Sequence, residues 1–257
     1  MWKDRDVRTL VTPGKDTDLI KLELGDISED QPLQLTSEGE ALIVILGGVL
    51  DVDVDGLALG RAGGRATVFD GPGDAVYVPP GSFVRLASTG GDAEVAIASA
   101  PLADVPAASA RIIKPADQRA ADVGNANWAR EVRTILGPEH DAGRLLVGET
   151  VTPPGNWSSY PPHKHDLHRP PDEVQLEEVY FFKVDPAGGF GVQLRYDHER
   201  EEVSTVRDGD VAIIRSGYHP VVAAPGYSLY YLWVMAGQGR QMIPWLEPQH
   251  AWVQDTR

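Results

Sequence analysis

The residues best suited to chemistry lie in the second half of the chain, where His163 and His165 flank Lys164. Side chains on a strand alternate between its two faces, so both imidazoles would project to one side and Lys164 to the other. Glu178 and His219 follow in segments that also have the character of strands. Three imidazole nitrogens and one carboxylate can hold a divalent transition metal and leave coordination positions for water or substrate. The pattern therefore predicts a catalytic metal site with these three histidines and Glu178 as ligands.

The composition limits the class of protein to which the chain can belong. Its 257 residues include 27 Gly and 20 Pro, which favours many short strands joined by turns. The formal net charge of -15 argues against a nucleic-acid partner, which needs a concentrated basic surface. An anionic substrate stays compatible with this charge if a few Arg or Lys residues line the site. The absence of Cys excludes disulfides, Cys-ligated zinc and thiol nucleophiles.

The sequence carries no targeting or membrane signal that we recognise. Its first 18 residues have no apolar core of the signal-peptide type, and no run of about 18 apolar residues occurs. We therefore expect no membrane partner and a cytoplasmic location.

Two β-rich halves repeat the same order of strands and turns. Strands are expected over 40–54 and 73–83 in the first half, and over 178–196 and 209–219 in the second. In each half a Gly-Gly turn comes first and a Gly-Asp turn second. An internal repeat of this kind predicts an all-β chain with two tandem copies of one β-barrel.

Only the second half carries the residues of the predicted metal site. Counting from the two Gly-Asp turns puts Phe83 where His219 stands, and no histidine precedes His140. We therefore predict a first domain over residues 1–110 without a metal and a second over 111–257 with one. The segment 101–127 is rich in Ala and Pro and is expected to connect them.

The second half also resembles a known family. The order His, His, Glu, His on strands of a small barrel resembles the cupin superfamily. More narrowly, four segments are similar to the 5-deoxy-glucuronate isomerase family of myo-inositol catabolism, to which the 4-deoxy-uronate isomerases of pectin breakdown are related. These segments are residues 155–166, 176–180, 189–191 and 217–221. The family shares the insertion of Asp166–Glu177 between the second His and the Glu. One departure is Trp233, where the family has a smaller polar residue, which leaves the substrate range open.

The resemblance implies a fold, a metal and a reaction. The fold would be a bicupin, and the metal would be zinc, with manganese or iron as alternatives. The reaction would convert an aldose to a ketose on a small anionic sugar acid, through an enediolate that a divalent metal stabilises. A nearby group must move the proton, and the candidates are Tyr180 and Glu177. Glu177 is also the alternative metal ligand to Glu178.

A cation is expected to bind the far carboxylate of such a substrate. Arg195 shares a strand face with Gln193 and could grip a carboxylate through two parallel hydrogen bonds. The alternative for Arg195 is an exposed position on the outer face, and Arg215 is a second candidate. The remaining histidines are expected in solvated or loop positions, namely His140, His168, His198 and His250.

Other functions are compatible with the same ligands. A cupin dioxygenase would use them to bind oxygen, and a sugar-acid-binding cupin would bind without turnover. Oxygen consumption separates the dioxygenase from the isomerase. The segment 227–235 is apolar along nearly its whole length, which suggests a strand buried on both faces and a homo-oligomer.

Overall fold

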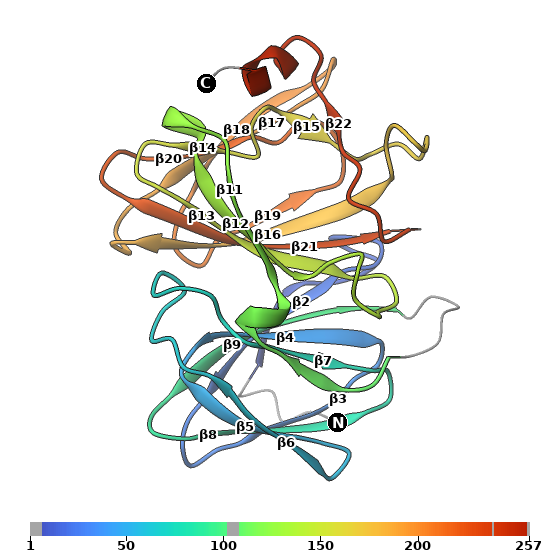
Figure 1. The fold of residues 1–257 in the computed structure, drawn as a ribbon, viewed down its shortest axis with the longest axis vertical. Coiled ribbons are helices and arrows are strands. Elements are labelled where there is room, and N and C mark those ends of the chain that lie inside the picture. The colour runs from blue at the N-terminus through green and yellow to red at the C-terminus, as the bar shows by residue number, and fades with distance from the viewer. Residues whose placement is uncertain (1–6, 102–107, 238, 256–257) are drawn as a thin grey trace. The chain divides into compact units, whose positions relative to one another are not determined.

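The computed structural model describes residues 7–101, 108–237 and 239–255 (Figure 1). Strands dominate, and the helical segments among the described residues are short 3-10 turns: η1 (Pro115–Asp117), η2 (Ala126–Trp128) and η3 (Ala251–Asp255). The predicted all-β class is therefore confirmed. None of the described helices is long and apolar enough to cross a membrane.

Contacts divide the chain into two compact units. The first contains the residues up to Arg119 together with Ile135–Leu146, and the second contains Ala120–Thr134 and the residues from Val147 onward. The predicted domain boundary at 110/111 stays a prediction. In the structure, residues after 110 contribute strands to both units. The connecting segment is described only in part, since residues 102–107 lie outside the described ranges.

The first unit consists of a six-stranded and a four-stranded sheet. The larger sheet has the order β1 (Val7–Val11), β2 (Lys21–Ile27), β9 (Ala93–Ala100), β4 (Glu40–Gly47), β7 (Ala75–Val78), β10 (Arg111–Ile113). The smaller sheet has the order β3 (Leu33–Thr36), β8 (Phe83–Ser88), β5 (Val49–Val54), β6 (Leu57–Gly63). Alternate residues of β4, such as Ile43 and Ile45, join Leu, Val and Ala side chains of both sheets in one buried aliphatic core.

The second unit repeats this plan with one additional ribbon. Its larger sheet has the order β11 (Arg119–Val123), β12 (Arg130–Leu136), β13 (Leu146–Thr152), β21 (Ser228–Gly237), β16 (Leu176–Asp185), β19 (Val211–Ile214). Its smaller sheet has the order β14 (Trp157–Ser158), β20 (Val221–Ala223), β17 (Gly191–Tyr196), β18 (Glu201–Val206). The ribbon pairs β15 (His163–Lys164) with β22 (Trp245–Leu246).

The centre of the second unit is the antiparallel pair of β16 and β21. Glu178 lies opposite Met235, Tyr180 opposite Trp233, and Phe182 opposite Tyr231. Residues directly opposite each other project to the same face of a sheet, so these six side chains lie on one face. Residues 229–236 of β21 are all buried, so both faces of this apolar strand are covered within the chain itself.

Candidate metal centre

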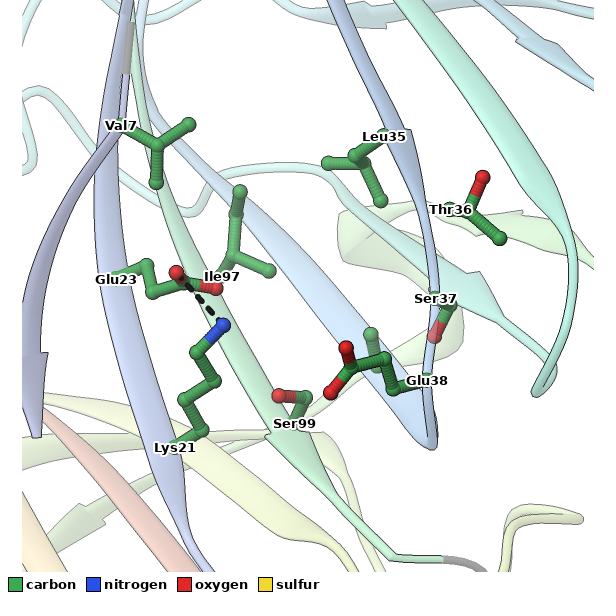
Figure 2. Close-up of a pocket in the computed structure, with 10 residues that line it drawn as sticks. Val7, Lys21, Glu23, Leu35, Thr36, Ser37, Glu38, Ile97 and Ser99 are labelled. Atoms are coloured by element: carbon green, nitrogen blue, oxygen red, sulfur yellow. Dashed lines mark ion pairs between the residues drawn. The ribbon is translucent and has the colours of Figure 1, made fainter. Parts of the chain in front are cut away.

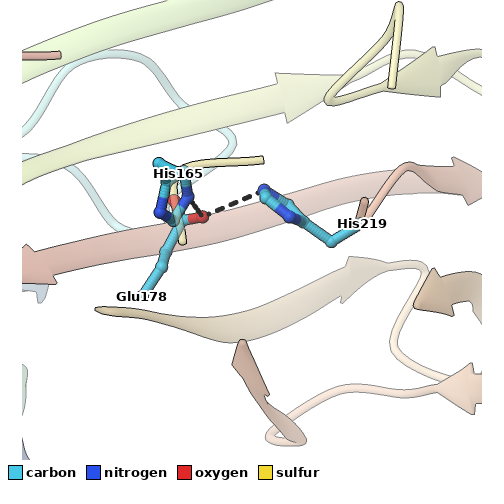
Figure 3. A group of neighbouring side chains, drawn as sticks. All are labelled: His165, Glu178 and His219. Carbon is cyan, nitrogen blue, oxygen red and sulfur yellow. Dashed lines mark hydrogen bonds and ion pairs between the residues drawn. The ribbon is translucent and has the colours of Figure 1, made fainter. Parts of the chain in front are cut away.

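Three ligand-type side chains from different parts of the second unit meet at one point. His165 follows β15, Glu178 lies on β16, and His219 lies in the loop between β19 and β20. Figure 3 shows both imidazoles directed at the carboxylate of Glu178, whose Oε2 is 3.0 Å from Nε2 of His165 and 3.2 Å from Nε2 of His219. All three residues are buried, and their ligand atoms lie within 4.8 Å of one another. We call these three residues the imidazole–carboxylate group.

Backbone carbonyls fix the tautomer of each imidazole. Nδ1 of His165 is 2.6 Å from the carbonyl oxygen of Leu176, and Nδ1 of His219 is 3.0 Å from that of Gly217. A carbonyl can only accept a hydrogen bond, so each Nδ1 must carry a proton and donate it. In a neutral ring this leaves the lone pair of Nε2 facing the carboxylate, an arrangement common among metal-binding histidines.

The group fits a bound cation. Two acceptor atoms that face each other at about 3 Å repel unless a proton or a metal cation lies between them. Nε2 of His219 is buried and has no hydrogen-bond partner among the described residues. Buried polar atoms without a partner are rare and call for a physical explanation. A divalent ion would supply it, so this buried group could bind a metal.

The charge state of Glu178 agrees with metal binding. Burial by itself would raise the pKa of Glu178, but the imidazoles of His165 and His219 lower it to about 2. Glu178 is therefore an anion at neutral pH. The pKa of His165 is raised, because the neighbouring Glu178 outweighs the effect of burial.

His163 lies beside the imidazole–carboxylate group without joining it as closely. Its ring centroid is 4.9 Å from that of His219 and 6.5 Å from that of His165. Burial, followed by the charges of His219 and His165, lowers the pKa of His163 to about 3, so its ring is neutral. Its Nδ1 is 3.3 Å from the carbonyl oxygen of Pro161. His163 as an additional ligand stays a prediction.

A buried carboxylate anchors the loop that separates the second His from Glu178. Glu173 is fully buried and accepts hydrogen bonds from the backbone N–H groups of Asp166 at 2.9 Å and Leu167 at 3.0 Å. It also pairs with Lys164, whose Nζ is 3.1 Å from Oε1 of Glu173. The carboxylate of Asp166 accepts the N–H of Gly217 at 2.8 Å. These bonds tie the segment of His165 to the segment of His219, and the spacing of residues alone gave no sign of them.

Hydroxyl groups line the same face of the barrel. The hydroxyl of Tyr180 is 2.8 Å from Oγ of Ser159, and that of Tyr231 is 2.6 Å from Oγ of Ser158. Ser159 adopts a positive φ of 50°, which is unusual for a residue with a side chain. Burial, and then the charge of Glu178, raises the pKa of Tyr180 well above its ordinary value. Tyr180 is therefore a protonated hydroxyl beside the carboxylate.

The other predicted site residues lie in different surroundings. Glu177 is adjacent to Glu178 in β16 and projects to the opposite face of the sheet, opposite Ala236. The guanidinium of Arg195 donates to Glu202 at 2.7 Å and to the carbonyl oxygen of Ile213 at 2.8 Å. Its carboxylate partner is therefore a residue of the neighbouring strand. His168 and His198 are exposed, as expected.

Trp233 faces the barrel interior and is 4% exposed. It lies directly opposite Tyr180 in the register of β16 and β21. A Cβ on Gly148 would come within 2.1 Å of the Trp233 ring, so the indole occupies the space that a side chain at position 148 would fill. The residue that departs from the family pattern therefore lies on the inner wall of the barrel.

Two further cavities differ in size and setting. One in the first unit lies near the ion pair of Lys21 and Glu23 (Figure 2) and holds about 50 Å³, which is small for a sugar acid. The other lies in the second unit, holds about 430 Å³ and has aromatic walls that include Trp128 and Trp157. Pro162 and Pro220, which adjoin His163 and His219 in sequence, also line it.

The fold and the site together define a bicupin in which one of the two barrels carries the imidazole–carboxylate group. Oxalate decarboxylase from Lactobacillus farciminis shares this fold, with a TM-score of 0.65 and 11% identity over 98% of this chain and 89% of that chain. The predicted bicupin fold is confirmed.

The chain belongs to the KduI/IolB family, whose model matches residues 4–253. A solved IolB-like protein from Salmonella typhimurium LT2 has a TM-score of 0.89 and 31% identity, with 96% of this chain and 94% of that chain covered. A protein named 5-deoxy-glucuronate isomerase from Geobacillus kaustophilus is 40% identical over 225 residues, which are 86% of this chain and 80% of that protein. A protein of the same name from Bacillus subtilis strain 168 is 34% identical over 253 residues, or 96% of this chain and 92% of that one. The family resemblance seen in the sequence is confirmed.

Proposed function

We propose that the chain is a metal-dependent isomerase that converts 5-deoxy-D-glucuronate to 5-dehydro-2-deoxy-D-gluconate in myo-inositol catabolism. Family membership and the shared name of the relatives support the substrate and the reaction. The observation that carries the metal dependence is the convergence of two imidazole Nε2 atoms on the buried carboxylate of Glu178. Neither the dioxygenase nor the non-catalytic binding protein is supported by the names of these relatives.

The reaction moves one proton between neighbouring carbons. The C–H bond beside the aldehyde breaks, its electron pair forms an enediolate, and this proton returns to the former aldehyde carbon. The hydroxyl proton of the neighbouring carbon moves from its oxygen to the former aldehyde oxygen, which gives the hydroxy-ketone. A divalent metal, when bound, offsets the negative charge that develops on the two oxygens. His165, His219 and Glu178 would hold this metal, with His163 as the fourth ligand. We propose zinc, because the reaction needs no redox change, with manganese and iron as alternatives.

Tyr180 is the group that we propose to move a proton at the substrate oxygens. Its hydroxyl lies on the same strand face as Glu178 and is oriented by Ser159 at 2.8 Å. Loss of a positioned proton-transfer group typically lowers the rate by about 10²–10⁴-fold. Tyr180→Phe should therefore lower kcat by about this factor and leave the metal content unchanged, whereas Glu177→Gln should leave kcat close to wild type.

The direct test combines turnover with metal analysis. The purified protein is loaded with zinc, manganese or iron and incubated anaerobically with 5-deoxy-D-glucuronate, while the product is followed by NMR. We expect a hydroxy-ketone product and one metal ion per chain. Oxygen consumption with the substrate would favour the dioxygenase, and binding without product would favour a sugar-acid-binding protein. Faster turnover of a 4-deoxy-uronate would reassign the substrate to the related pectin branch.

A further inference from the structure

Arg130 lies at the first position of β12, and its side chain points to the inner face of the second barrel. Its neighbour Arg133 bonds Glu131 at 2.6 Å and lies 3.8 Å from Glu149. Glu149 also accepts the hydroxyl of Tyr230, which alternates along β21 with the inward-facing Tyr231. The Arg133 cluster is therefore on the outer face. Because successive residues alternate, Arg130 projects the opposite way, towards the interior.

Arg130 is half-buried, with Cζ of its guanidinium 5.7 Å from the ring centroid of Trp128, and it lacks an anionic partner among the described residues. It donates one hydrogen bond, from Nη1 to the carbonyl oxygen of Trp128 at 3.1 Å. Its Nε is buried without a hydrogen-bond partner among the described residues. A polar N–H that is shielded from water without an acceptor is unfavourable, so an anion that enters the barrel and accepts from Nε would relieve this cost.

The surroundings of Arg130 connect it to the proposed reaction site. Burial lowers the pKa of the Arg130 guanidinium, and the phenol groups of Tyr231 and Tyr180 act in the opposite direction. Tyr180 and Glu178 project from the same inner face of β16, and Arg130 points to the interior that this face lines. Ser159 contacts both phenols, at 2.8 Å for Tyr180 and 3.4 Å for Tyr231.

A second buried polar group without a hydrogen-bond partner among the described residues lies on the inner wall. Thr152 projects from the same face of β13 as Gly148, whose missing side chain leaves room for the inward-facing Trp233. The hydroxyl of Thr152 is buried and has no hydrogen-bond partner among the residues that the structure describes. A cation, a free hydroxyl and a chain of phenol and serine hydroxyls thus share one interior, as a polyol with one carboxylate would require.

We infer that Arg130 binds the carboxylate of the sugar acid while the aldehyde end of the same sugar acid lies at the imidazole–carboxylate group. This inference rests on the proposed function and gives Arg130 the role that the sequence suggested for Arg195. Arg195 already donates to Glu202, whereas Arg130 has a free edge for two parallel hydrogen bonds to a carboxylate. The hydroxyls of Tyr231 and Ser159 would then face the hydroxyls in the middle of the substrate.

The test compares a charged ligand with an uncharged one in the metal-loaded enzyme. Binding of D-glucuronate and of D-glucose is measured by calorimetry for wild type, Arg130→Met, Arg130→Lys and the matched control Arg195→Met. We expect Arg130→Met to weaken D-glucuronate binding roughly 100-fold, the scale of a lost buried charge pair, and to change D-glucose binding by less than about threefold. Arg130→Lys should restore part of the loss, because it keeps the charge without the planar fork. Arg195→Met should behave as wild type.

Kinetics with 5-deoxy-D-glucuronate provide an independent readout. Arg130→Met should lower kcat/KM roughly 100-fold with an unchanged metal content. Three results would overturn the role of Arg130. The first is an equal loss of D-glucuronate and D-glucose binding in Arg130→Met, and the second is a charge-selective loss in Arg195→Met instead. The third is wild-type binding that does not prefer D-glucuronate. If D-glucuronate binding depends on Arg130 while wild type does not isomerise 5-deoxy-D-glucuronate, the proposed function fails and the carboxylate site stands.

Discussion

The two barrels share one order of strands, but the interior of the first is aliphatic and the interior of the second carries buried polar side chains. In the first unit Ala41 of β4 lies opposite Val78, and in the second Glu178 of β16 lies opposite Ile214, at the same place relative to the Gly-Asp turn. The position that holds the buried carboxylate in one barrel thus holds a methyl group in the other. Phe83, the counterpart of His219, is 43% exposed, whereas His219 is fully buried.

The difference continues along the strands. Ile43 lies opposite Ile97 in the first unit, where the second has Tyr180 opposite Trp233. The first barrel is filled by aliphatic side chains that need no partners. The second buries imidazoles, a carboxylate and hydroxyls, several with unsatisfied atoms, each of which costs free energy of folding. We conclude that the plan of strands tolerates either interior, and that the polar one is retained for chemistry.

The largest effect is expected from removing an imidazole of the second barrel. His165→Ala or His219→Ala should leave metal well below one ion per chain and lower turnover by at least about 10³-fold, because the charge stabilisation at the reaction centre is lost. Metal analysis and NMR turnover measure both. His198→Ala is the matched control, since the His198 side chain is 89% exposed. Full metal occupancy in either variant would remove that histidine from the ligand set.

The next effect separates two adjacent carboxylates. Glu178→Gln keeps the side-chain shape and removes the negative charge between the imidazoles, so metal affinity should fall at least about tenfold. Glu177→Gln changes the opposite face of β16 and should leave metal affinity close to wild type. Competition with a chelator measures both affinities. The reverse order would mean that the register of β16 is shifted by one residue and that Tyr180 points away from the site.

A smaller and purely structural effect is expected in the first barrel. Ile43 is fully buried opposite Val76 and Ile97, so Ile43→Ala should lower the free energy of unfolding by about 2–5 kcal/mol. Metal content and kcat of the folded fraction should stay unchanged, because this interior takes no part in the chemistry. Denaturant unfolding, followed by metal analysis below the transition, tests both. A loss of metal in the folded protein would show that the two interiors are coupled.

Much of this contrast could be read from the sequence. The repeated order of strands and turns predicted two barrels, and strand alternation predicted that Lys164 points away from His163 and His165. Position in the strand also favoured Glu178 over Glu177. These inferences need only the period of two along one strand and the spacing of the turns.

The remaining features depend on which strands become neighbours. Arg195 donates to Glu202 only because β17 and β18 pair in that register. The inward direction of Arg130 follows from the outer cluster around Glu149, which lies on another strand. Glu173 becomes an anchor through backbone N–H groups of its own folded loop. No single segment carries these contacts, so spacing alone does not predict them.

The smallest expected effect tests whether one histidine can convert the first barrel. Phe83→His places an imidazole at the counterpart of His219, but the side chain at this position is exposed and lies outside the aliphatic core. The backbone there is held by bonds between Phe83 and Asp55, at 2.7 and 2.8 Å, which the substitution leaves intact. We expect no second metal ion per chain and a stability change within about 0.5 kcal/mol. Metal analysis and thermal unfolding measure both quantities. Ala41 offers no carboxylate where Glu178 offers one, which is a further reason to expect no second ion. A second bound ion would mean that the interior of the first barrel can open to position 83.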